Sequence, residues 1–210
     1  VIAADQVRPL PAGLSVQHGA LAEPLAVALH AINRAGGVRG REVLVNGAGP
    51  IGLLLVAAAK RLGATRVVAA DIAGPALGIA AELGADETRN LADGESLPAD
   101  AELVFEASGV PAALAGVLRS AARGGTVVQV GNLPGVPSPA ALGELVSREI
   151  SWIGSFRFID EISDALVLLG DGLDLTPVIS HTFELEEAVA ALTAASEPGS
   201  SKVMIRLSAG

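Results

Sequence analysis

The feature that most constrains this chain is an apolar run that leads directly into three closely spaced glycines. Residues 43–52 read Val-Leu-Val-Asn-Gly-Ala-Gly-Pro-Ile-Gly, and a second apolar run follows at 53–59. This order predicts a β-strand, a Gly-x-Gly-x-x-Gly turn and an α-helix, whose first N–H groups and positive dipole end attract a phosphate group. The segment therefore predicts one strand–turn–helix unit of an α/β fold, with a phosphate site at the turn.

The three glycines of this motif have separate physical reasons. Gly47 permits the tight turn, Gly49 lets a pyrophosphate approach the backbone, and Gly52 lets the helix pack close to the strand. Pro50 suits the first helical turn, where no backbone donor is needed. Because the chain contains 25 glycines, the motif alone could also be a structural turn without a ligand.

An acidic residue strengthens the interpretation as a ligand site. Asp71 follows the second expected strand, close to the ~20-residue separation at which a carboxylate accepts hydrogen bonds from adenosine ribose hydroxyls. A carboxylate there would repel a 2′-phosphate, and no Arg or Lys occurs from Ile72 through Thr88 to bind one. The sequence therefore predicts a dinucleotide site that prefers NAD to NADP. The competing class is a methyltransferase that uses S-adenosylmethionine, and three glycines at this spacing favour the longer ligand.

Short β-like runs alternate with helical stretches from residue 42 onward. This alternation predicts βαβ units and a doubly wound parallel sheet with the strand order 3-2-1-4-5-6. The expected strands lie near 43–46, 66–70, 87–90, 103–106, 126–130 and 150–153, and the expected helices near 51–62, 76–83, 111–121 and 140–147. Small residues follow the fourth and fifth strands, at 107–109 and 130–132, and would leave room there for a nicotinamide ribose.

The two flanks of the chain differ from this central pattern. We expect an extended stretch at 7–14 and a helix at 21–33 before it. After it we expect a helix near 161–169, a short strand near 181–183, a helix near 186–195 and a strand near 202–207. The dinucleotide site is expected in the central α/β region between these flanks.

Composition excludes several other classes of protein. The absence of Cys excludes a disulfide scaffold and a Cys-ligated zinc within this chain. A net charge of -9 opposes binding to nucleic acid. The uncharged runs 43–59 and 124–143 are broken by Gly and Pro, so we expect soluble core there and no membrane span. No signal peptide is expected, and the composition suits the cytoplasm.

Several segments together resemble a known family. They are 21–27 (Leu-Ala-Glu-Pro-Leu-Ala-Val), the glycine motif, 106–109 (Glu-Ala-Ser-Gly), 124–126 (Gly-Gly-Thr) and 154–158 (Gly-Ser-Phe-Arg-Phe). The whole chain resembles the Rossmann and C-terminal part of the zinc-type medium-chain alcohol dehydrogenases, and the first and last segments are most similar to the sorbitol and L-idonate 5-dehydrogenase branch.

The resemblance implies an incomplete catalytic unit. Residues 1–22 would be the tail end of a GroES-like catalytic domain, residues 23–158 the NAD-binding Rossmann domain, and residues 159–210 a connecting helix and the return to the catalytic domain, as a C-terminal fragment of it. The zinc ligands are then expected upstream of Val1. The only Met is Met204, which agrees with a processed start or a piece of a longer protein.

The resemblance also implies the roles of individual residues. Ile51 and Asp71 would contact the adenosine half of NAD, Glu23 would lie close to a zinc-bound water or substrate, and Arg157 would contact substrate. The expected cofactor-binding residues are Gly47, Gly49, Pro50, Ile51, Gly52, Asp71, Ser108, Val130, Gly131, Asn132, Ser155, Phe156 and Arg157. Two positions depart from the polyol pattern: Phe158 stands where Tyr is frequent, and Ala76 where Arg is frequent.

Simpler roles remain open for some of these residues. Arg157 could form a structural ion pair, and Glu23 could be a favourable charge at a helix N-terminus. His30 is expected to be packed, and no role is assigned to any histidine. Trp152 is expected in the core or an interface.

These expectations combine into one functional prediction. The resemblance implies that the chain is part of an NAD-dependent, zinc-type dehydrogenase that oxidises a secondary alcohol of a polyol or sugar acid, such as sorbitol or L-idonate, by hydride transfer. Alone, the chain should bind NAD without turnover. The alternatives are a stand-alone NAD-binding or sensor module and a zinc-free quinone reductase relative. A homodimer or homotetramer is expected, because the apolar sixth strand exposes an edge that needs covering.

Overall fold

Six parallel strands form the central sheet in the order β3-β2-β1-β4-β5-β6. The computed structural model describes residues 3–197 and 199–207; the outer ends of the expected regions 1–22 and 159–210 lie outside the described residues. The strands are β1 (Glu42–Asn46), β2 (Arg66–Asp71), β3 (Glu87–Asn90), β4 (Ala101–Glu106), β5 (Ala121–Gln129) and β6 (Ser151–Gly154). The predicted doubly wound order is confirmed.

The strand register aligns the carboxyl ends of four strands. Asn46 at the end of β1 lies beside Glu106 of β4, Glu106 lies beside Gln129 of β5, and Gln129 lies beside Gly154 of β6. In a doubly wound sheet the ligand crevice opens outside this edge, at the point between β1 and β4 where the strand order reverses. The fold therefore brings the segments after these four strands together at one place.

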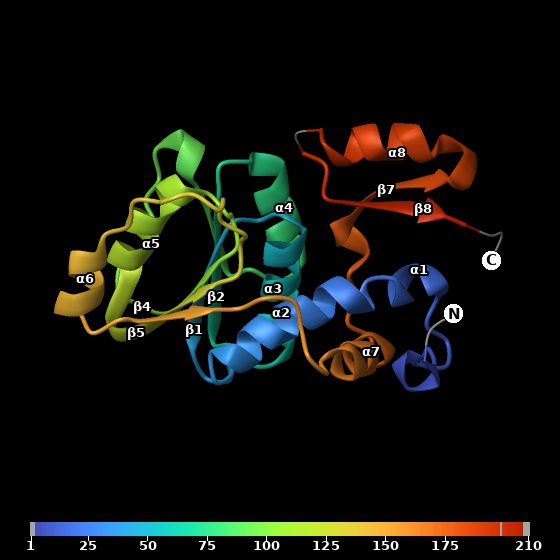
Figure 1. The fold of residues 1–210 in the computed structure, drawn as a ribbon, viewed down its shortest axis with the longest axis horizontal. Coiled ribbons are helices and arrows are strands. Elements are labelled where there is room, and N and C mark those ends of the chain that lie inside the picture. The colour runs from blue at the N-terminus through green and yellow to red at the C-terminus, as the bar shows by residue number, and fades with distance from the viewer. Residues whose placement is uncertain (1–2, 198, 208–210) are drawn as a thin grey trace.

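Helices cover both faces of the sheet (Figure 1). On one side lie α2 (Ala22–Arg34), α3 (Pro50–Arg61) and α4 (Gly74–Glu82), and on the other lie α5 (Leu114–Ser120) and α6 (Leu142–Ser147). Successive strand residues point to opposite faces of the sheet, and each face has its own hydrophobic core. Val43 and Val45 belong to the first core, on the side of α2, α3 and α4, whereas Leu44 belongs to the second core, with Val117 of α5. Because both faces are covered there, the central strands β1, β2 and β4 each contain a run of consecutive buried residues.

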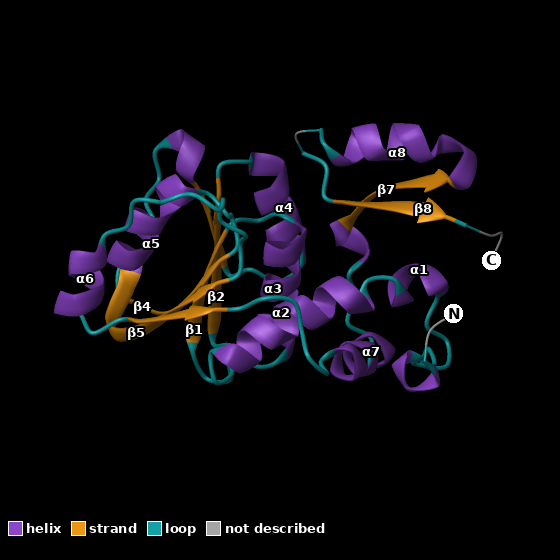
Figure 2. Cartoon of the chain, viewed as in Figure 1, coloured by secondary structure: helices purple, strands orange, loops and turns teal. Residues whose placement is uncertain are grey.

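The remaining elements form a second group beside the sheet (Figure 2). Helix α7 (Ile162–Gly170) contacts α2 and the short helix α1 (Val16–Gly19). Strands β7 (Ile179–Glu184) and β8 (Lys202–Arg206) form a separate parallel pair, and α8 (Ala188–Ala195) contacts both of them. Short 3-10 turns occur at Ala4–Gln6, Leu91–Asp93, Pro111–Ala113, Thr176–Val178 and Leu185–Glu187.

Two local features differ from the expectation. The helix expected at 111–121 is present, as a 3-10 turn followed by α5, but β5 begins at Ala121, five residues before the expected position 126. The early part of this strand contains Gly124 with a φ of 70, so its sequence looks like a turn although Ala121 pairs with Ala101. Helix α1 was not expected, because four residues show no helical period; Ser15 caps it by accepting a hydrogen bond from the His18 backbone at 3.2 Å.

None of the helices in the described part of the chain combines the length and the apolar character needed to cross a membrane. Trp152 is partly buried against the second core, as expected, and β6 is an edge strand of the sheet.

Candidate functional site

The glycine turn lies between β1 and α3, and its three glycines meet different surroundings. Gly47 has a φ of +100, and a Cβ built on it would lie 2.5 Å from the Ser108 backbone nitrogen. A Cβ on Gly52 would lie 1.8 Å from the Gly47 carbonyl oxygen. A Cβ on Gly49 would meet no atom within 4 Å. The first and third glycines are therefore required by the fold, whereas the second leaves open space at the start of α3.

Asp71 fastens the glycine turn to the end of β2. Its Oδ2 accepts a hydrogen bond from the Ala48 backbone at 2.5 Å, and its Oδ1 accepts one from the Ala73 backbone at 2.9 Å. A carboxylate has roughly four acceptor positions, so both oxygens can still accept from ribose hydroxyls. The structure thus gives Asp71 a positioning role in addition to the expected ligand contact.

A buried carboxylate that the sequence analysis did not single out organises the neighbouring loop. Glu106, at the end of β4, is 0% exposed. One oxygen accepts from the Asn46 amide at 2.5 Å; the other accepts from the backbone nitrogens of Ser108 at 2.8 Å and Gly109 at 3.1 Å, and from the Ser108 hydroxyl. Its backbone oxygen also accepts from the Val130 and Gly131 nitrogens. Glu106 therefore fixes the segments after β1, β4 and β5 relative to one another.

A pocket of about 480 Å³ opens along this carboxyl edge of the sheet. Eight of the expected residues line it: Ile51, Ser108, Val130, Gly131, Asn132, Ser155, Phe156 and Arg157. Ala107 and Gly109, from the small-residue stretch 107–109 expected at this crevice, also line it, and Val27, which was not assigned to the site, completes the lining. Ile51, expected at the adenosine half together with Asp71, lines this pocket, whereas Asp71 does not; its contact with the cofactor stays a prediction. The other expected residues, Gly47, Gly49, Pro50 and Gly52, belong to the glycine turn.

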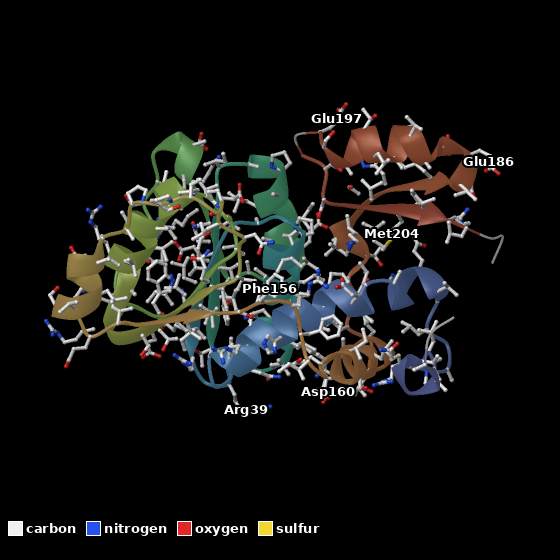
Figure 3. All side chains as sticks on the ribbon, in the orientation of Figure 1. Arg39, Phe156, Asp160, Glu186, Glu197 and Met204 are labelled. Atoms are coloured by element: carbon white, nitrogen blue, oxygen red, sulfur yellow. The ribbon has the colours of Figure 1, made fainter. Side chains whose placement is uncertain are left out.

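The segment after β6 forms the outer side of the pocket. Arg157 has a φ of 55, and its guanidinium lies 5.4 Å from the centre of the Phe156 ring, a distance at which the cation and the ring attract each other. Phe156 itself is 69% exposed, and Figure 3 labels it beside α2. The Ser155 hydroxyl is buried and has no hydrogen-bond partner in the structure. An unpaired buried hydroxyl on a pocket wall fits a site that takes a polar ligand.

Glu23, the other expected catalytic residue, is exposed in the first turn of α2 and does not line the pocket. Val27, one helical turn later on the same face of α2, does line it. The structure therefore brings Arg157 to the pocket, and puts Glu23 on the helix face that leads towards it.

The described residues contain no group of three or more His, Cys, Asp and Glu side chains that could hold a metal ion. His30 is buried against Glu161, as its expected packed position required. The residues of this part of the chain therefore fit a dinucleotide, with an open glycine turn, a pocket and an unpaired hydroxyl, but they do not by themselves fit a zinc site.

The fold and the site define a Rossmann-type α/β domain with a ligand crevice across the carboxyl ends of its strands. The chain belongs to the zinc-binding dehydrogenase family, whose pattern it matches over residues 50–171.

Named relatives agree with this assignment. The chain is 36% identical over 198 residues to an Escherichia coli (strain K12) protein named L-idonate 5-dehydrogenase (NAD(P)(+)), covering 90% of this chain and 57% of the relative. It is 35% identical over 208 residues to the sorbitol dehydrogenase of Ovis aries, covering 94% of this chain and 58% of the relative. The chain thus spans less than two thirds of the length of these relatives.

Solved structures resemble it over nearly its whole length. The crystal structure of Escherichia coli L-idonate 5-dehydrogenase has a TM-score of 0.92 at 33% identity, covering 98% of this chain and 61% of that one. A Sinorhizobium meliloti 1021 protein bound to NADP has a TM-score of 0.90 at 30% identity, covering 98% of this chain and 64% of that one.

Proposed function

We propose that this chain binds NAD across the carboxyl edge of its sheet and presents the nicotinamide for hydride transfer from a secondary alcohol of a polyol or sugar acid. The observation that carries the proposal is the alignment of the glycine turn and the 480 Å³ pocket along one edge, at the ends of β1, β4, β5 and β6. The names of the relatives, L-idonate 5-dehydrogenase and sorbitol dehydrogenase, supply the substrate class.

The dinucleotide would lie along the sheet in one direction. Its adenosine half lies at the end of β2, where Asp71 accepts from the ribose hydroxyls. Its pyrophosphate lies over Gly49, against the N–H groups and the positive end of α3. The nicotinamide half then reaches the pocket, between Ile51 on one side and residues 155–157 on the other.

The charged residues at the pocket would select the substrate. The planar guanidinium of Arg157 can bind a carboxylate or paired hydroxyls with two parallel hydrogen bonds, which suits a sugar acid. Glu23 would lie close to the substrate hydroxyl, on the face of α2 that also carries Val27. When bound, the nicotinamide accepts a hydride from the alcohol carbon. A zinc ion would supply Lewis-acid polarisation of the alcohol oxygen, and the described residues contain no group of three or more His, Cys, Asp and Glu side chains to hold it.

Preference for NAD is a specific part of the proposal. A relative is named for both NAD and NADP, and a similar structure holds NADP, so the preference is not a property of every neighbour. Here the carboxylate of Asp71 opposes a 2′-phosphate, and Arg89, the first cation after Asp71, is already paired with Glu87.

Calorimetric titration of the chain with NAD and, separately, with NADP tests the proposal. Binding of NAD with NADP at least about tenfold weaker supports it. Binding of neither dinucleotide contradicts the assigned site. Incubation of the chain with NAD and either sorbitol or L-idonate tests the expectation that it does not turn over alone, and normal turnover would overturn that expectation.

Self-association is a separate proposal. The edge strand β6 carries the partly buried Trp152 and Ile153, and pairing of two such edges across a two-fold axis would cover them. Sedimentation analysis should give a dimer or tetramer, and a clean monomer at high concentration contradicts this proposal.

A further inference from the structure

The segment from Ser155 to Glu161 connects β6 to α7 and carries three residues of the pocket wall. It has no regular helix or strand, and Arg157 within it adopts a positive φ of 55, which is uncommon for a residue with a side chain. Such a segment holds one conformation only if neighbouring elements fasten it. The question is therefore what fixes the pocket wall.

Glu161 fastens the far end of this segment. Its side chain belongs to a residue only 8% exposed. The Oε2 atom accepts from the backbone nitrogens of Ile159 at 2.8 Å and Asp160 at 3.2 Å, and so closes the segment on itself. The Oε1 atom accepts from His30 Nδ1 at 2.8 Å and from Asn33 Nδ2 at 3.1 Å. Both donors lie on α2, on the side of the helix that faces α7.

The ionisation of this group fixes the direction of the hydrogen bonds. Burial alone would raise the pKa of Glu161, but the hydrogen bonds from His30, Ile159 and Asn33 outweigh it and lower that pKa to about 2. The carboxylate is therefore ionised at neutral pH and can only accept. It follows that Nδ1 of His30 carries a proton.

Helix α2 also fastens the near end of the segment. Arg34 Nε donates to the Gly154 carbonyl oxygen at 3.2 Å, and the Ser155 backbone nitrogen donates to Gln129 at 2.9 Å. The same helix contributes Val27 to the pocket wall. One helix thus forms part of the pocket and holds both ends of the segment that also forms the wall.

We propose that Glu161, held by His30 and Asn33, is a positioning residue for the nicotinamide end of the pocket: it fixes the distance between α2 and residues 155–157. This inference rests on the proposed NAD site. Glu161 does not touch the ligand; it holds the backbone of Ile159 and Asp160, and so acts on the preceding residues 155–157 of the same segment. Loss of the carboxylate should therefore affect the nicotinamide half of a ligand and spare the adenosine half.

The substitution Glu161→Gln tests this proposal with little change of shape. An amide has one oxygen and one NH₂ group, so one of the two donor pairs then faces another donor. Asp86→Asn is the matched control: Asp86 also accepts from a cation, Lys60 at 2.9 Å, and from a backbone nitrogen, Val67 at 2.7 Å, but it lies at the amino end of β3, away from the pocket. Asn33→Ala is a second, milder variant at an exposed position.

The readout compares two ligands, NAD and ADP-ribose, by calorimetric titration of each variant, with thermal unfolding to check folding. We expect Glu161→Gln to weaken NAD about tenfold and leave ADP-ribose within about twofold, and Asn33→Ala to act in the same direction to a smaller extent. Asp86→Asn should leave both affinities unchanged. If Glu161→Gln does not fold, the Asn33→Ala result decides.

Three results would overturn the inference. Equal NAD affinity in wild type and the folded variants removes the positioning role while leaving the NAD site intact. Equal weakening of NAD and ADP-ribose means that Glu161 has only a general structural role. A wild-type chain that binds neither ligand refutes the proposed function itself, and this outcome is distinct from the other two.

Discussion

Two variants of the glycine turn, each of which adds one methyl group, separate the folding role of the motif from its binding role. In Gly52→Ala the new carbon would lie 1.8 Å from the Gly47 carbonyl oxygen, a backbone atom that cannot move without shifting β1 or α3. In Gly49→Ala the new carbon meets nothing within 4 Å. Gly49 has a φ of -68 and a ψ of 178, which alanine adopts without strain. The two variants differ only in where the methyl group points.

The magnitudes follow from these contacts. Overpacking of a core typically costs about 1–3 kcal/mol, and a clash this close with backbone belongs at or above the upper end. At about 2–4 °C per kcal/mol for a domain of this size, Gly52→Ala should lower the melting temperature by roughly 10 °C. Gly49→Ala should keep or raise the melting temperature, because alanine lowers the conformational entropy of the unfolded chain. That effect stabilises the fold by about 0.4–1 kcal/mol. Its NAD affinity should nevertheless fall at least about tenfold, since the methyl group occupies the pyrophosphate position.

Calorimetric unfolding and NAD titration of both variants check this reasoning. A stable Gly49→Ala variant that binds NAD as wild type does would refute the assignment of the pyrophosphate to this turn. A Gly52→Ala variant with an unchanged melting temperature would contradict the packing argument.

Three further predictions concern acidic residues. Glu106→Ala should lower the free energy of unfolding by roughly 3–5 kcal/mol, because four donors lose a buried acceptor, whereas Glu106→Gln should cost roughly 1–2 kcal/mol; equal melting temperatures for both variants would contradict this. The pKa of Glu161 falls from an ordinary 4.5 to about 2 on folding. Its contribution to the free energy of unfolding is therefore complete above about pH 5 and is lost as the pH falls from there towards 2. This stabilisation by the ionised carboxylate is at most roughly 3 kcal/mol. The free energy of urea unfolding, measured from pH 6 to 3, should therefore depend less on pH in Glu161→Gln than in wild type. Asp71→Asn should narrow the preference for NAD over NADP by removing the repelling charge; an unchanged ratio of the two affinities would show that another residue sets it.

The strand order and the glycine turn could be predicted because both depend on local sequence. Each βαβ unit is right-handed and short, so the alternation from residue 42 onward leaves few possible topologies. The residues after β4, β5 and β6 could be predicted for the same reason: the carboxyl ends of parallel strands share one edge. The chain's membership of the zinc-binding dehydrogenase family was also predictable, from combined segments such as 21–27 and 154–158.

Interactions between distant segments could not be predicted. Glu106 stands 60 positions from Asn46, and Glu161 stands 131 positions from His30, so neither pair has a local signal. Val27 reaches the pocket only because α2 packs across the same face of the sheet as α3. The one available hint was a carboxylate, Glu106, directly after the apolar run 103–105, since a buried charge needs donors around it.

The central claim is that one dinucleotide spans the carboxyl edge, with adenosine at Asp71 and nicotinamide at residues 155–157. Backbone amide NMR of the ¹⁵N-labelled chain, titrated with ADP-ribose and then with NAD, tests it most directly. Both ligands should shift the amides of residues 47–49, 51–52 and 71–73, and only NAD should also shift those of 130–132 and 155–157. Shifts confined to another surface, or the same pattern of shifts with both ligands, would contradict this account.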